Sequence, residues 1–126
     1  MKHLLLVALG GAVGASCRHL VGLAALRLLG PGFPWGTLAV NVLGSFAMGV
    51  FIEMLLHRLG GSPDLRYIIA TGFLGGFTTF SAFSLDFAVL WERGDVTQAG
   101  LYLLASVLFS VFALFAGLWV VRTLAV

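Results

Sequence analysis

Residues 71–84 read TGFLGGFTTFSAFS, and this stretch lies in the middle of an apolar run over residues 67–91. A straight helix over residues 66–91 would be about 39 Å long, whereas the hydrocarbon core of a bilayer is about 30 Å thick. Gly75-Gly76 is the most flexible pair in the run, and hydroxyl groups follow it where hydrocarbon offers them no partner. The pattern predicts a membrane-spanning helix that is broken near its middle, with polar groups facing protein, water or an ion.

The composition of the whole chain agrees with a membrane protein. Apolar residues make up 60% of the 126 residues and charged residues only 10%, which excludes an ordinary soluble domain. Four apolar runs are each long enough to cross a bilayer, and they cover residues 4–29, 35–56, 67–91 and 99–121. The connections between them leave no room for a further domain. We predict an all-α membrane protein in which residues 1–126 form a single domain of four transmembrane helices.

The first apolar run combines small residues with a buried cation. Gly10, Gly14, Arg18 and Gly22 recur at every fourth position, and small residues at this spacing allow another helix to approach closely. A cation inside a span costs about 2.5–3.5 kcal/mol on insertion scales, so Arg18 requires a partner or a watery pocket. A hydrogen bond to carbonyl groups and the attraction of an anion are equally open roles.

Two acidic residues fall inside the apolar runs. Glu53 and His57 are four residues apart near the end of the second run and are expected to pair at the membrane interface. Asp86 follows the hydroxyl-rich stretch and is a candidate partner for a cation such as Arg18. A proton-coupled small exporter would depend on one of these acids, which makes it one alternative function.

The other polar groups of the second, third and fourth runs fall on helix faces that we expect to point inward. Phe80 and Phe83, three residues apart, share a face, and the positive edges of two phenyl rings can receive a small anion. Ordinary packing of these rings is the alternative. The expected inward set contains hydrogen-bond donors and ring edges but no carboxylate; it comprises Thr37, Asn41, Thr79, Phe80, Ser81, Phe83, Tyr102, Ser106 and Ser110. Such a set predicts a small anion as the transported species.

The basic residues give only a weak orientation signal. Four of them lie on one side of the predicted bundle and two on the other; the first group is Lys2, Arg58, Arg66 and Arg122, and the second is Arg27 and Arg93. Copies inserted in both orientations could therefore pair about an axis in the membrane plane. A single orientation set by small biases is equally compatible with the sequence.

The motifs resemble those of one known family. The segment GTLAVNVLGSF (residues 36–46), the segment GGFTTFSAFS (residues 75–84) and the first-run pattern around Gly10, Gly14 and Arg18 are similar to the Fluc (CrcB) fluoride channels of prokaryotes. The resemblance extends over nearly the whole chain, and the motif in the third run is specific. One departure is Ala82, because the family often has threonine at this position.

The resemblance implies an antiparallel, dual-topology homodimer in the inner membrane of a prokaryotic cell, with two pores that conduct fluoride passively outward. It implies that Asn41, Phe80 and Phe83 line each pore, accompanied by Tyr102, Ser110 and Thr37. It also implies that the backbone carbonyl groups of Gly75 and Thr78 from both subunits hold a sodium ion at the dimer centre. The expected partners are thus fluoride, sodium, a second copy and the lipid bilayer, and no nucleic acid.

Two further classes of function are a non-transporting membrane subunit and an enzyme. A non-transporting membrane subunit would use its polar faces only to bind neighbouring helices. An enzyme is not expected, because His3, His19 and His57 are scattered and no nucleophile with a paired base is recognisable.

Overall fold

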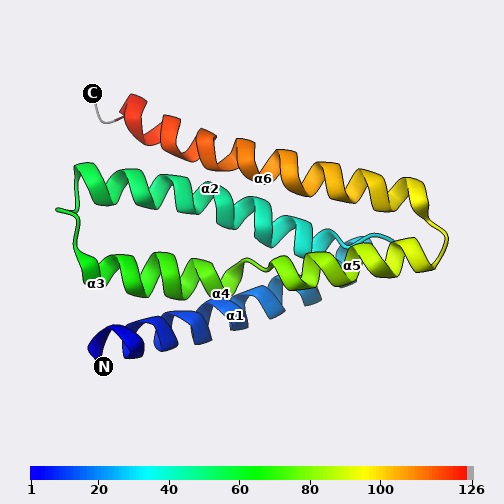
Figure 1. Cartoon of the computed structure of the whole chain (residues 1–126), viewed down its shortest axis with the longest axis horizontal. Coiled ribbons are helices and arrows are strands. Elements are labelled where there is room, and N and C mark those ends of the chain that lie inside the picture. The colour runs from blue at the N-terminus through cyan, green and yellow to red at the C-terminus, as the bar shows by residue number, and fades with distance from the viewer. Residues whose placement is uncertain (125–126) are drawn as a thin grey trace.

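A computed structural model describes residues 1–124 and shows an all-helical protein with four long apolar helices (Figure 1). Three spans are single helices: α1 (Lys2–Leu29), α2 (Trp35–His57) and α6 (Val96–Leu124). The third span is a series of α3 (Pro63–Leu65), the π-helical segment η1 (Arg66–Leu74), α4 (Gly75–Phe77) and α5 (Phe80–Glu92). The N-terminus, the α2–α3 connection and the end of α6 lie at one end of the bundle, and the other two connections lie at the opposite end.

The connections at the second end begin with glycines in left-handed backbone conformations. Gly30, with φ 77°, follows α1 and precedes Pro31, and Gly94, with φ 86°, lies between α5 and α6. Glycine adopts such angles without steric cost, and proline cannot continue the helix. At the first end, the Ser62 hydroxyl accepts a hydrogen bond from the Leu65 amide and caps the start of the third span.

The third span is interrupted as predicted, but three residues later than the glycine pair. The helix continues through Gly75 and Gly76, and the backbone becomes extended at Thr78 (φ −87°, ψ 156°) and Thr79 (φ −153°, ψ 119°). A Cβ atom on Gly76 would lie 2.6 Å from the carbonyl oxygen of Gly11 in α1. The role of Gly76 is therefore to let α1 approach closely, and not to open the helix.

Two pairs of helices are in backbone contact at glycines. In α1, a Cβ on Gly10 or Gly14 would collide with carbonyl oxygens of η1, which confirms that this face accepts another helix. In the second pair, a Cβ on Gly49 of α2 would collide with the Leu114 carbonyl oxygen of α6, and one on Gly117 would collide with that of Phe46. These contacts fix α1 against the third span and α2 against α6.

A buried ionic cluster holds the ends of α2 and α6 together. Glu53 is only 3% exposed, and its Oε1 atom lies 2.8 Å from His57 Nε2 and 3.0 Å from Arg122 Nε. The predicted pairing of Glu53 with His57 is confirmed, and Arg122 from α6 joins it. A buried carboxylate without such partners would be strongly destabilising.

Candidate functional site

The break between α4 and α5 is held by one side chain of α2. The Asn41 amide nitrogen donates to the carbonyl oxygen of Thr79 at 3.0 Å, and the Asn41 oxygen accepts from the Thr79 N–H at 2.8 Å. The Thr79 hydroxyl in turn accepts from the Ala82 N–H at 3.1 Å and caps α5. Asn41 thus satisfies two backbone groups that the break releases, and one of its two amide hydrogens is left over.

A cavity of about 340 Å³ lies beside this break. Side chains from α2, the break, α5 and α6 line it: Asn41, Ser45, Thr78, Thr79, Phe80, Phe83, Ser106, Val107, Ser110 and Val111. Most of the polar and aromatic residues expected to face inward therefore meet at one place. Ser45 was not in the predicted set, although its position four residues after Asn41 places it on the same helix face. No carboxylate lines this cavity.

Two serine hydroxyls in the cavity wall have no hydrogen-bond partner. The Oγ atoms of Ser106 and Ser110 are buried and unpaired among residues 1–124. Serine in a helix commonly bonds back to the carbonyl group four residues earlier, as Ser16 and Ser84 do here at 2.7 and 3.0 Å. Because a buried hydroxyl without a partner is costly, Ser106 and Ser110 have donors available for a species inside the cavity.

The two phenylalanines border the cavity in different ways. Phe83 is 6% exposed and packs between Phe80 and Tyr102, with ring centroids 5.4 and 5.2 Å away. Phe80 is 77% exposed and points away from the bundle core. One ring is therefore fixed by packing within the chain, whereas the other is open to its surroundings.

Three residues of the predicted set lie outside the cavity lining. Tyr102 is fully buried, and its hydroxyl donates to Asp86 Oδ2 at 3.1 Å. Thr37 lies beyond the phenylalanines, in the wall of a second pocket. Ser81 is exposed, with its hydroxyl 3.3 Å from that of Thr79.

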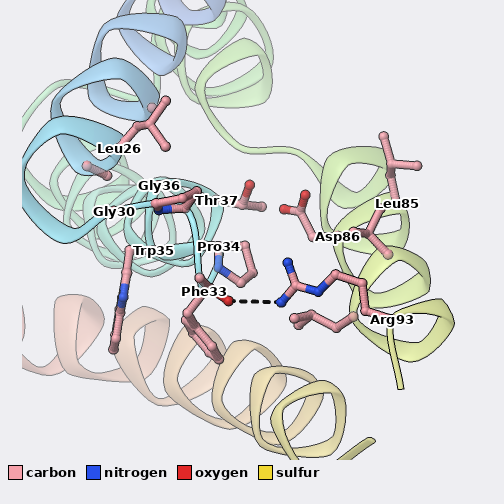
Figure 2. Close-up of a pocket in the computed structure, with 16 residues that line it drawn as sticks. Leu26, Gly30, Phe33, Pro34, Trp35, Gly36, Thr37, Leu85, Asp86 and Arg93 are labelled. Carbon is pink, nitrogen blue, oxygen red and sulfur yellow. Dashed lines mark hydrogen bonds between the residues drawn. The ribbon is translucent and has the colours of Figure 1, made fainter. Parts of the chain in front are cut away.

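That second pocket has a volume of about 360 Å³ and opens near the α1–α2 connection (Figure 2). Thr37, Asp86 and Arg93 contribute its polar side chains, and backbone groups of the connection contribute the rest of its polar surface. Tyr102 is one helical turn before Ser106 on α6, and it contacts both Phe83 and Asp86. Tyr102 thus links Phe83, which lines the cavity, to Asp86, which lines the second pocket.

The part-buried cation of α1 bonds to a carbonyl group, which is one of the two roles that the sequence left open for it. Arg18 Nε donates to the carbonyl oxygen of Gly76 at 3.0 Å, so a carbonyl group and not Asp86 receives it. Next to it, the carbonyl oxygens of Gly75 and Thr78 accept no hydrogen bond within the described part of the chain. The reason is that the Thr79 and Ala82 amides, which a continuous helix would direct to them, bind Asn41 and the Thr79 hydroxyl instead.

Comparison with known proteins identifies relatives over the full length. A family described as "CrcB-like protein, Camphor Resistance (CrcB)" matches residues 5–118. The chain is 60% identical over 124 residues to the "Fluoride-specific ion channel FluC" of Mesorhizobium japonicum, covering 98% of this chain and 99% of that protein. A protein with the same name from Chelativorans sp. is 60% identical, with 98% of this chain and 99% of that protein covered. Another from Rhizobium etli (strain CIAT 652) is 57% identical, with 99% of this chain and 100% of that protein covered.

Proposed function

The chain belongs to the CrcB family of fluoride-specific ion channels, and from this we propose that it conducts fluoride passively out of the cell. It is a multi-pass membrane protein of an ion-channel family and not an enzyme. The observation that carries the proposal is the cavity at the helix break, where two buried serine hydroxyls have no partner among residues 1–124. Uncharged donors in a confined space suit a compact anion that has lost part of its water.

We assign the pore-lining roles to Asn41, Thr79, Phe80, Phe83 and Ser110. Within the cavity, the free amide hydrogen of Asn41 and the hydroxyl of Ser110 would donate to fluoride, and the ring edges would supply weaker positive potential. Thr37, Ser81 and Tyr102 would act outside the cavity, at its ends. Because Ala82 carries no hydroxyl, one donor that is common in the family is missing from this path.

The active form is proposed to be an antiparallel homodimer with two pores, in which residues 1–126 of each copy form one transmembrane domain. Its support is a face that a bilayer alone would not cover well, since Phe80, Ser81 and Gly75 are exposed beside the break at mid-span. The four-to-two division of basic residues also gives little preference for one orientation.

A sodium ion fits the carbonyl groups beside the break. Carbonyl oxygens are suitable ligands for a hard cation, and those of Gly75 and Thr78 lack hydrogen-bond donors within residues 1–124. Gly75 is exposed, so a second copy could complete the oxygen shell. A bound cation between two anion paths would lower the electrostatic cost of anion passage.

The two alternative functions receive less support. The exporter would need an acid deep in the transport path, but no carboxylate lines the cavity at the break, and Glu53 is paired with His57 and Arg122. If the protein were a non-transporting subunit, nothing would explain why the Ser106 and Ser110 hydroxyls are buried without a partner among residues 1–124.

Efflux from proteoliposomes distinguishes the three functions, which are a fluoride channel, an exporter and a non-transporting subunit. Vesicles loaded with potassium fluoride or potassium chloride and given a potassium ionophore should release fluoride rapidly and retain chloride. Equal release of both anions would contradict the proposed selectivity. Dependence of the flux on a proton gradient would favour the exporter, and vesicles no leakier than protein-free ones would favour the non-transporting subunit.

A further inference from the structure

The second pocket has the position of an entrance to the proposed conduction path. It lies at the end of the bundle where the Gly-Pro-Gly-Phe-Pro connection follows α1. Trp35 comes directly after this connection, and tryptophan favours the membrane–water interface. Thr37 and Asp86 line this pocket. Asp86 accepts a hydrogen bond from the Tyr102 hydroxyl, and Tyr102 lies one helical turn before Ser106, which lines the cavity. Asp86, Tyr102 and Ser106 thus form a short series of polar side chains that leads from the second pocket to the cavity wall.

The carboxylate in this pocket would repel an anion unless a positive charge offset it. Two charged side chains line it, Asp86 and Arg93. The Asp86 carboxylate would repel an approaching anion, and the Tyr102 hydroxyl compensates it only in part because it is uncharged. Arg93 supplies the positive charge among the lining residues, and its ion pair with Asp95, at 2.8 Å, already offsets part of that charge.

The guanidinium of Arg93 is held in place at the mouth. Its Nη2 atom donates to the Gly32 carbonyl oxygen at 3.1 Å and to Asp95 Oδ2 at 2.8 Å, and its Nε atom donates to the same carboxylate oxygen at 3.1 Å. In Figure 2 the other terminal nitrogen points into the pocket on the side of Asp86. No ion pair joins Arg93 to Asp86 in the part of the chain that the structure describes.

We propose that Arg93 is a charge-determining residue at one mouth of the fluoride path, where its guanidinium offsets part of the negative charge of Asp86 and Asp95 and keeps the local concentration of anions in the second pocket higher than it would be without this cation. The inference rests on the proposed channel function and adds to it the residue that controls access at this end. Such steering depends on charge and is weakened by salt. Arg93 would therefore influence the rate of access and leave the fluoride-over-chloride selectivity unchanged, because selectivity resides in the uncharged cavity.

The first test compares fluoride efflux at low fluoride concentration for wild type, Arg93→Gln and Arg27→Gln. Arg27 is a matched control, since it lies in the last turn of α1 at the same end of the bundle but does not line the pocket. At an ionic strength of about 0.01 M, set with the salt of a large impermeant anion, we expect Arg93→Gln to be roughly three- to tenfold slower than wild type. At about 1 M the difference should disappear, because the Debye length falls to about 3 Å. Arg27→Gln should release fluoride as fast as wild type at both ionic strengths.

A second test separates charge from structural support, since Arg93 also braces the α1–α2 connection. Arg93→Cys in a Cys17→Ser background is treated in detergent, before reconstitution, with a cationic or an anionic methanethiosulfonate reagent. The cationic adduct should restore flux at low ionic strength, and the anionic adduct should reduce it below that of the unmodified variant. Identical effects of the two adducts, or unchanged flux in Arg93→Gln, would overturn the role of Arg93 while wild-type conduction upholds the channel. Absence of fluoride release by the wild type would instead overturn the channel function and this inference together.

Discussion

Replacement of Asn41 by leucine should destabilise the break between α4 and α5, because a single amide holds both sides of the Thr79 peptide group. The net value of one hydrogen bond is about 0.5–1.5 kcal/mol, so loss of the two should cost about 1–3 kcal/mol. If no water replaced the amide, two unsatisfied backbone groups would cost about 2–6 kcal/mol. Thr79 lines a cavity of about 340 Å³, which is large enough for water, so we expect the smaller range.

Equilibrium unfolding in mixed detergent micelles measures this loss. Ser45→Ala is the matched control, because Ser45 lies one turn further along α2, lines the same cavity and makes no hydrogen bond to the described residues. Asn41→Asp should fall between Asn41→Leu and wild type, since an ionised carboxylate still accepts from the Thr79 amide but no longer donates to its carbonyl group. Unfolding of Asn41→Leu at the same denaturant fraction as Ser45→Ala would refute the reasoning.

Three further outcomes follow from the cavity and its supports. Ser110→Ala should slow fluoride efflux roughly tenfold without loss of stability, because the Ser110 hydroxyl has no partner to lose within the described part of the chain, whereas Ser84→Ala should leave efflux unchanged. Equal effects of the two substitutions in the proteoliposome assay would contradict this role. Phe83→Ile should abolish most efflux while the proposed dimer persists in size-exclusion chromatography, and normal flux would remove the ring from the mechanism. Gly49→Leu should lower the free energy of unfolding by about 1–3 kcal/mol or more through overpacking of α2 against α6, and unfolding like wild type in mixed micelles would argue against that contact.

Helix faces could be predicted from the sequence because the helical period alone determines them. Asn41, Phe83, Ser106 and Ser110 were assigned inward faces, and the structure brings all four to one cavity. The interruption of the third span also followed from its length and its hydroxyl groups. Whether these residues line a pore stays a prediction, because the sequence and the fold show proximity and not conduction.

The sequence could not predict how the helices are placed along the bundle axis. The break was expected at Gly75-Gly76, but contact with α1 keeps the glycines helical, and the Asn41 amide stabilises the extended backbone at Thr79 instead. Asp86 was a candidate partner for a cation such as Arg18, yet its height on α5 places it within hydrogen-bond distance of Tyr102. These partners depend on the relative heights of side chains from different helices, which helical periodicity does not specify.

The glycine contact between α2 and α6 determines those heights for the two polar walls of the cavity. The two helices run in the same direction along the bundle, and they touch at Gly49 and Gly117 (Figure 1). Asn41 precedes its contact glycine by eight residues and Ser110 precedes its own by seven, which is about 12 Å and about 10 Å along the two helices. The Asn41 amide and the Ser110 hydroxyl therefore face the cavity at nearly the same height because backbone packing about two turns away sets the register. An alteration of that packing should affect conduction even though neither glycine lines the cavity, so the same contact supports both the fold and the site.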